Sequence, residues 1–236
     1  FDDFVSGSMG VIERKGPNIY ETFPVIVSNG DGTYRDATQE VEGQEDNTPI
    51  QTFNFSHDIS VGDVNGDGYD DIFQGKHLVL SNGDGSFTNA TDFLPSVLGP
   101  IGDYPPLMSS EIADFNNDGF GDILGFYMEH STSRYENSGF IWMSVGSEFD
   151  ERYLLPIGDG RYDHETFPGQ TNTKFNYSIS YDINQDGWLD IVTAVTRAIP
   201  YYQGSHIQIF ENQQGVDFID KTSTYIDFTA DMDTRW

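Results

Sequence analysis

The sequence predicts an all-β fold made of consecutive four-stranded antiparallel sheets, and three observations support this prediction. A loop pattern, Asp-x-Asn-x-Asp-Gly-x-x-Asp-Ile, occurs three times, at 63–72, 114–123 and 182–191. A turn pattern, Ser-Asn-Gly-Asp-Gly, occurs at 28–32 and again at 81–85. Short apolar runs rich in β-branched and aromatic residues follow the loop pattern, which is typical of strands joined by tight loops. One structural unit is therefore repeated along the chain.

The loop pattern has the composition of a calcium-binding loop. Side chains with oxygen atoms occupy positions 1, 3, 5 and 9, and the glycine at position 6 allows a sharp turn. The backbone carbonyl of position 7 can complete a cage of hard oxygen ligands, which suits Ca²⁺. We therefore expect Ca²⁺ as the cofactor, bound once per loop. The predicted ligand sets are Asp63, Asn65, Asp67, Tyr69 and Asp71; Asp114, Asn116, Asp118, Phe120 and Asp122; and Asp182, Asn184, Asp186, Trp188 and Asp190.

The loops differ from EF-hands after position 9. An EF-hand needs a bidentate Glu at position 12, followed by a helix, whereas position 12 here is Gln74, Gly125 or Thr193. The aspartate at position 9 leads instead into an apolar run, such as 191–195 in the third loop. Each loop is therefore expected to connect two strands.

The first complete unit shows how the expected strands follow one another. Its strands are predicted at 59–61, 72–74, 78–80 and 87–88. The first two flank the calcium loop, and the last two flank an Asn-Gly-Asp-Gly turn, which is a strong hairpin signal. A looser version of this hairpin occurs at 212–218. Four antiparallel strands in about 50 residues are the content of one blade of a β-propeller.

These strings resemble FG-GAP repeats, also called VCBS-type repeats. The resemblance covers roughly residues 1–223. It implies an all-β fold, a β-propeller or propeller fragment of four-stranded blades with calcium loops, similar to the blades of integrin α-subunits, many secreted bacterial proteins and fungal lectins. It also implies a calcium-binding adhesion or recognition module that binds a protein or a carbohydrate outside the cell.

The repeats predict a single domain over 1–236, with units 1–55, 56–108, 109–174 and 175–224 and a degenerate unit that starts within 225–236. Both ends carry part of a loop, because Asp3 matches position 9 whereas Asp231 and Asp233 match positions 1 and 3. Two explanations are open. The chain is part of a longer protein with further blades, or its two half-loops meet and close a ring.

The composition of the chain excludes some partners. The 236 residues carry a formal net charge of −28, which repels nucleic acids and anionic membranes. No run of 18 apolar residues is present, so we expect no direct membrane insertion. Cysteine is absent, so we expect metal ions rather than disulfides to stabilise the fold. Loops of this kind need calcium at about millimolar concentration, which predicts an extracellular or cell-surface location.

The predicted ligand face lies on insertions between the second and third strands of the units, at 7–24, 125–141 and 196–205. These insertions concentrate aromatic and basic residues in a chain with 11 Lys and Arg. Because antiparallel strands alternate in direction, the insertions leave each sheet at the end opposite the calcium loop. The ligand-face residues are Arg134, Tyr135, Tyr201 and Tyr202. The alternative is that these side chains cover blade edges or pack against neighbouring blades.

No catalytic group of residues stands out in the sequence. The obvious carboxylates are assigned to calcium, and a metal-bound carboxylate is a poor general acid because the cation favours its ionised form. We therefore expect no catalysis by this segment. Two alternatives remain: the calcium-stabilised propeller of a secreted polysaccharide-degrading enzyme, and a structural subunit of an extracellular filament or surface layer that self-associates through exposed blade edges.

Overall fold

The computed structural model describes residues 4–5, 25–40, 58–74, 77–95, 107–127, 139–155, 173–197 and 203–226. In these ranges the chain is all-β, as the sequence predicts, apart from short helical turns such as α1 (Thr222–Tyr225). The described strands form four antiparallel sheets, of which three have four strands and one has three. None of the described helices is long and apolar enough to cross a membrane.

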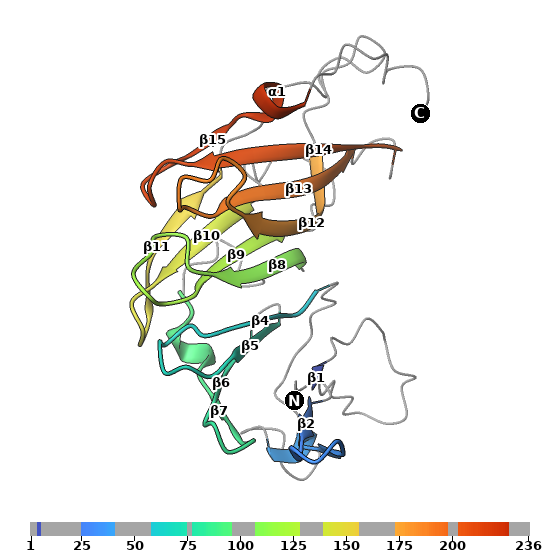
Figure 1. The fold of residues 1–236 in the computed structure, drawn as a ribbon, viewed down its shortest axis with the longest axis vertical. Coiled ribbons are helices and arrows are strands. Elements are labelled where there is room, and N and C mark those ends of the chain that lie inside the picture. Colours follow the sequence, from blue (N-terminus) through green and yellow to red (C-terminus); the bar gives the residue numbers. More distant parts are fainter. Residues whose placement is uncertain are drawn as a thin grey trace.

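Each sheet uses one contiguous stretch of chain and pairs its strands in sequence order. The sheets follow one another along the long axis of the molecule, from the first near the bottom to the fourth at the top (Figure 1). The first sheet contains β1 (Phe4–Val5), β2 (Val25–Ser28) and β3 (Tyr34–Asp36); the second contains β4 (Ser60–Gly62), β5 (Asp71–Gln74), β6 (His77–Ser81) and β7 (Phe87–Asn89); the third contains β8 (Leu107–Ala113), β9 (Asp122–Tyr127), β10 (Gly139–Ser144) and β11 (Phe149–Leu154); and the fourth contains β12 (Thr173–Tyr181), β13 (Asp190–Arg197), β14 (Gln203–Asn212) and β15 (Phe218–Asp220).

The strands predicted for the first complete unit are confirmed to within one residue at each end. Their boundaries follow from the turn residues. Gly83 and Gly85 have φ values of 73° and 88°, which glycine adopts without steric cost and which turn the chain from β6 into β7. Asp84 Oδ1 accepts hydrogen bonds from the amide and the hydroxyl of Ser86 at 2.9 and 2.6 Å, and so fixes this turn. The looser hairpin is also present and joins β14 to β15.

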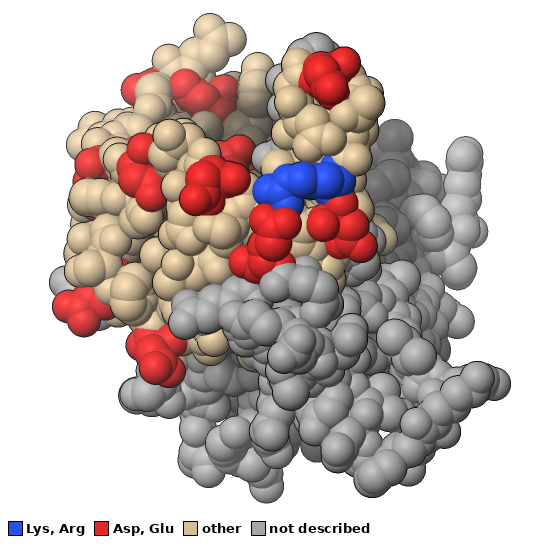
Figure 2. Space-filling view, turned by 90° about the horizontal axis from the view of Figure 1, so that it is seen from below, with Lys and Arg blue, Asp and Glu red and all other residues tan. Residues whose placement is uncertain are grey.

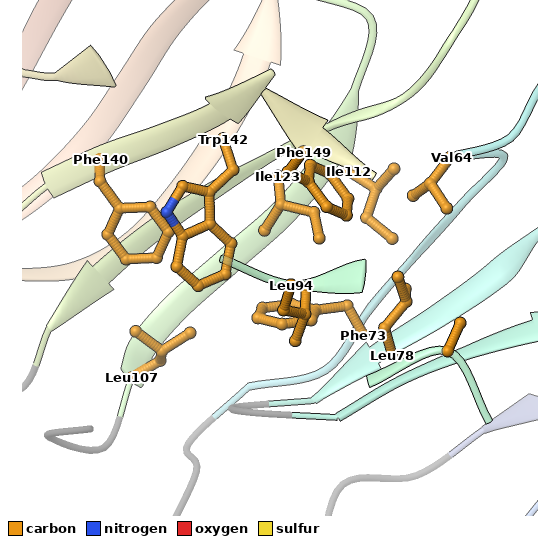
Figure 3. Close-up of a cluster of buried hydrophobic side chains, with 11 residues drawn as sticks. Val64, Phe73, Leu78, Leu94, Leu107, Ile112, Ile123, Phe140, Trp142 and Phe149 are labelled. Carbon is orange, nitrogen blue, oxygen red and sulfur yellow. The ribbon is translucent and has the colours of Figure 1, made fainter. Parts of the chain in front are cut away.

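Apolar side chains fill the space between neighbouring sheets. Trp142 is fully buried between the second and third sheets, with its ring centroid 4.4 Å from that of Phe140 and 6.2 Å from that of Phe73 (Figure 3). Burying one such large side chain stabilises the fold by about 1.5–3 kcal/mol. Equivalent clusters lie between the first and second sheets, around Ile72 and Val79, and between the third and fourth, around Leu124 and Phe210. The four sheets therefore form one packed row.

Hydrogen bonds made by side chains join the first strands of the last three sheets. β8 lies beside both β4 and β12. The hydroxyls of Ser60 and Ser110 lie 3.0 Å apart, and those of Ser109 and Ser178 lie 2.9 Å apart. In addition, the Ser180 amide donates to Glu111 Oε1 at 2.8 Å. These bonds form a polar seam along β4, β8 and β12.

Candidate metal centres

The three predicted calcium loops are all described, and each connects the first strand of a sheet to the second. In all three copies, the carboxylate at position 1 accepts hydrogen bonds from the backbone amides of positions 5 and 6 of its own loop. Asp63 accepts from Asp67 at 3.2 Å and from Gly68 at 2.7 Å. The same two bonds recur at Asp114, at 3.1 and 2.9 Å, and at Asp182, at 3.0 and 2.9 Å. The first residue of each loop therefore sets the path of the turn that follows it.

Positions 3 and 5 also bind each other and the loop backbone in all three copies. In the first copy, Asn65 Oδ1 accepts from the Asp67 amide at 3.0 Å, and Asn65 Nδ2 donates to Asp67 Oδ2 at 2.9 Å. Asp67 Oδ1 then accepts from the amide of Tyr69 at 2.9 Å. The second and third loops repeat these bonds within about 0.1 Å. The sequence pattern therefore produces one loop conformation three times.

The aspartate at position 9 is fully buried in each copy and connects its loop to the third strand of the sheet. Asp71 accepts the amide of Val64 through one oxygen and the amide of Ser81 through the other, both at 2.9 Å. Asp122 makes the same two bonds with Phe115 and Ser144, and Asp190 makes them with Ile183 and Asn212. Position 9 is therefore a structural residue of the sheet as well as a predicted ligand.

Burial raises the pKa of the Asp71 carboxyl to about 6 and that of Asp122 to about 7, and it also raises the pKa of Asp190. Hydrogen bonds from backbone amides oppose this effect, whereas the loop carboxylates at positions 1 and 5 (Asp63 and Asp67 in the first copy) add to it for Asp71 and Asp122. A carboxyl whose pKa is higher in the folded than in the unfolded chain costs folding free energy when it ionises near neutral pH. A bound cation would offset that cost.

The side chains of each loop supply the right atoms for calcium, but they do not converge on one point in this structure. Carboxylate, amide and carbonyl oxygens are the ligands that Ca²⁺ prefers, and none of the loop aspartates pairs with a Lys, Arg or His among the described residues. In the same part of the chain, no three His, Cys, Asp or Glu side chains lie close enough together to share a metal ion. Backbone amides donate hydrogen bonds to these carboxylates.

The residue at position 7 has a second role that the sequence did not reveal. A Cβ atom placed on Gly83 would overlap the ring of Tyr69, and one placed on Gly146 would lie 2.7 Å from the ring of Phe120. Trp188 covers Gly215 in the same way. These glycines lie in the hairpins between the third and fourth strands. The predicted calcium loop and this hairpin therefore lie at the same end of the second, third and fourth sheets, as the strand directions predict.

Hydrogen bonds also join neighbouring loops. The Gly121 amide donates to the carbonyl of Asp63 at 2.7 Å, and the Ser144 hydroxyl donates to the carbonyl of Val64 at 2.7 Å. Between the next two loops, Asn117 Nδ2 donates to the carbonyl of Gly187 at 3.1 Å. Sequence reasoning missed these residues, although Ser81, Ser144 and Asn212 follow their loops at equivalent positions of the third strands. The three loops form one connected layer.

The predicted ligand face falls outside the described residues. Arg134 and Tyr135 lie in 128–138, and Tyr201 and Tyr202 lie in 198–202. The described strands do fix where these segments leave the sheets. β9 starts at Asp122, next to its calcium loop, and ends at Tyr127, so the connection to β10 leaves from the opposite end. The same holds for β13 and β14.

Among the charged side chains visible on the described surface in Figure 2, acidic ones predominate, and the blue basic group is bordered by red ones. Arg35 forms an ion pair with Glu40, and its guanidinium also donates to the carbonyl of Gly85 at 3.4 Å. This surface agrees with the net charge of −28.

A scan against protein-family models gives no match for this chain, and a search of curated proteins finds no similar sequence.

Proposed function

We propose that the four sheets are consecutive blades of a β-propeller of the FG-GAP type, and that the chain is a calcium-binding recognition module outside the cell. The observation that carries this proposal is the threefold loop, which has the same oxygen donors, the same hydrogen bonds and the same place in three sheets. A chance turn sequence has no reason to keep a buried aspartate in all three copies.

The ions would be held by positions 1, 3 and 5, by the carbonyl of position 7 and by the aspartate of position 9 in each loop. A bound Ca²⁺ supplies positive charge where the chain places only acidic groups. The aspartate at position 9 would connect a bound ion to the rest of its sheet, because it accepts a hydrogen bond from a backbone amide of the third strand. This holds for Asp71, Asp122 and Asp190. The proposed role of calcium is therefore to hold the sheets in order.

Recognition of a protein or glycan is assigned to the other end of the sheets. The connections between β9 and β10 and between β13 and β14 leave from that end and include Arg134, Tyr135, Tyr201 and Tyr202. Loops on a rigid scaffold are the usual place of binding residues, and Tyr and Arg are enriched at interfaces. Calcium at one end and a ligand at the other would make the metal a support for binding rather than a contact.

Calcium titration of chelator-treated protein by isothermal calorimetry tests the metal sites. We expect three ions per chain, and two for the double variant Asp114→Asn/Asp118→Asn, which loses two ligands of one loop. Asp70→Asn is the matched control, because Asp70 is an exposed loop residue outside the predicted ligand set. Fewer than two ions bound to the unaltered chain would contradict the proposal.

A glycan array, together with a panel of extracellular matrix proteins, tests the recognition role. The variant Tyr135→Ala/Tyr202→Ala should lose binding to whichever probe the unaltered chain binds, while its calcium-dependent melting stays the same. If the tyrosine changes have no effect but Asp118→Ala abolishes binding in a folded protein, the ligand is held through the metal and the assignment of the two ends is wrong.

A further inference from the structure

The aspartates at position 9 of the predicted calcium loops are connected to one another by hydrogen bonds. The first loop is 63–71, the second 114–122 and the third 182–190. One carboxylate oxygen of each aspartate accepts the amide of position 2 of its own loop, and the other accepts the amide of a residue on the third strand of its sheet. The third-strand residues are Ser81, Ser144 and Asn212. The side chains of the last two also reach the loop of the preceding sheet.

Ser144 connects the second loop to the first. Its amide donates to Asp122 Oδ1 at 2.9 Å, and its hydroxyl donates to the carbonyl of Val64 at 2.7 Å. The Val64 amide then donates to Asp71 Oδ2 at 2.9 Å. All four residues on this path are buried. Hydrogen bonds inside a protein are electrostatically stronger than in water, and bonds that follow one another polarise each other.

Asn212 connects the third loop to the second in the same way. Its amide donates to Asp190 Oδ1 and its side-chain Nδ2 donates to the carbonyl of Phe115, both at 2.8 Å. The Phe115 amide donates to Asp122 Oδ2 at 2.9 Å. Asp122 is therefore shared by both paths, since its other oxygen accepts from Ser144. One continuous path of hydrogen bonds runs through the position 9 aspartates of all three loops.

Two further hydrogen bonds restrict how far neighbouring loops can move apart. The amide of Gly121, in the second loop, donates to the carbonyl of Asp63 at 2.7 Å. A Cβ atom on Gly121 would lie 2.7 Å from the same oxygen, so a side chain there would collide with the first loop. Between the second and third loops, Asn117 Nδ2 donates to the carbonyl of Gly187 at 3.1 Å. A shift of one loop therefore disturbs bonds of the next.

We propose that Ser144 and Asn212 are positioning residues that couple the metal sites, so that a loop binds its cation more tightly when the neighbouring loop is already filled. This coupling rests on the calcium sites proposed above. An aspartate at position 9 that is held by its own ion keeps the hydrogen bonds of the path in place, and the aspartate of the next loop is then ordered before it binds. Coupling between two sites is reciprocal, so it acts in both directions along the row.

Two variants that lose the same number of carboxylates test the coupling on the whole chain. Asp182→Asn/Asp186→Asn leaves the first and second loops, which are neighbours. Asp114→Asn/Asp118→Asn leaves the first and third loops, which are not. In a calcium titration of chelator-treated protein we expect two ions for each variant, a Hill coefficient clearly above about 1 for the first and close to about 1 for the second. Repulsion between bound cations would have the opposite effect, because it is larger for neighbouring sites.

Ser144→Ala, added to the variant that retains neighbouring loops, tests the residue itself. The two ions should still bind, but the Hill coefficient should fall to about 1. Ser144→Thr retains the hydroxyl and should retain the coupling. Ser81→Ala is the matched control, because the Ser81 hydroxyl accepts the Gly83 amide at 3.3 Å as that of Ser144 accepts the Gly146 amide at 3.1 Å. No loop of this pattern is described in the sheet before Ser81, so its loss should leave the coefficient unchanged.

Hydrogen exchange provides a second measurement of the coupling. In Asp63→Asn/Asp67→Asn the first loop lacks two ligands, and the exchange rate of the Val64 amide reports how well the rest of this loop is ordered. Calcium bound by the other two loops should slow this exchange by about fivefold or more, and Ser144→Ala should abolish the effect.

The outcomes separate the coupling from the calcium sites. Equal Hill coefficients for the two loop variants, with two ions bound to each, would overturn the coupling and leave the sites standing. Fewer than two ions bound to the unaltered chain would overturn both. A Hill coefficient that Ser144→Ala leaves unchanged would show that Ser144 is not the link. If circular dichroism shows that Ser144→Ala is unfolded, the comparison of the two loop variants decides.

Discussion

Asn212 shows how much a single side chain contributes to the layer of loops. It is buried, and its Nδ2 donates to the carbonyls of Phe115 and Leu189 at 2.8 and 3.0 Å. Its Oδ1 accepts from the amide of Gly215 at 2.7 Å. One residue thus joins two neighbouring predicted calcium loops to the hairpin after β14. A shorter side chain cannot replace these contacts.

Asn212→Ala should therefore be strongly destabilising. Each buried polar group left without a partner costs about 1–3 kcal/mol, so we expect the free energy of unfolding in urea to fall by at least about 2 kcal/mol. Val216→Ala is the control, because Val216 is exposed on the same hairpin and should change stability little. A loss of less than about 0.5 kcal/mol for Asn212→Ala would mean that water satisfies these groups.

At the scale of elements, the ring at position 7 packs a predicted calcium loop against the hairpin of the same sheet. The Phe120 ring lies against Gly146 of its own sheet and Gly66 of the preceding loop. Gly146 has a φ of 85°, which glycine adopts without steric cost. The absence of a side chain at Gly146 also leaves space for the Phe120 ring. The aromatic residue and the glycine form one packing unit, and the other two sheets repeat it with Tyr69 and Trp188.

Phe120→Ala should loosen the hairpin at 145–148 without unfolding the sheet. We expect faster hydrogen exchange at the amides of Val145 and Gly146, which donate to the Glu148 carbonyl and to Ser144 Oγ. Phe120→Tyr serves as the matched control, since tyrosine fills this position in the first loop, and it should retain slow exchange. Equal exchange in Phe120→Ala and the unaltered chain would show that the ring does not hold the hairpin.

Most of the local structure could be predicted from the sequence, because Asp, Asn and Gly recur at the loops and turns that separate the strands. The predicted strand boundaries in the second sheet agree with the observed ones to within one residue. The alternating directions of the strands also predicted that the loop and the hairpin lie at the same end of a sheet. The Ser109 and Ser178 contact could not be predicted. It depends on which face each side chain takes after irregularities in the register, between Leu107 and Ser109 in β8 and between Phe175 and Tyr177 in β12. Spacing alone does not locate such shifts.

At the scale of the whole molecule, the main feature is a large excess of acidic groups on a row of packed sheets. The net charge is −28, and three Ca²⁺ ions would add six positive charges, which leaves about −22. Self-repulsion opposes the compact state when no ions are bound. Stability should therefore depend on calcium throughout the row, since hydrogen bonds join the loops.

Chelation of calcium should lower the melting temperature by many degrees. Each site that binds only the folded chain adds about 2.7 kcal/mol when free calcium is about 100-fold above its Kd. Differential scanning calorimetry in calcium and in excess chelator measures the difference. Added NaCl should recover only the part that comes from general charge screening. Identical melting curves in calcium and chelator would show that the loops are ordinary turns.

The contiguous, in-order pairing of strands also bears on how the chain is built and how it changes over evolutionary time. Each sheet pairs only strands of its own contiguous segment, so it can assemble as soon as that segment leaves the ribosome. Each newly folded sheet then displays an apolar face that the next segment covers. Gain or loss of a whole unit leaves every remaining contact of the same type intact, as in other linear repeat arrays. Such a chain can lengthen by duplicating one segment without redesigning its neighbours.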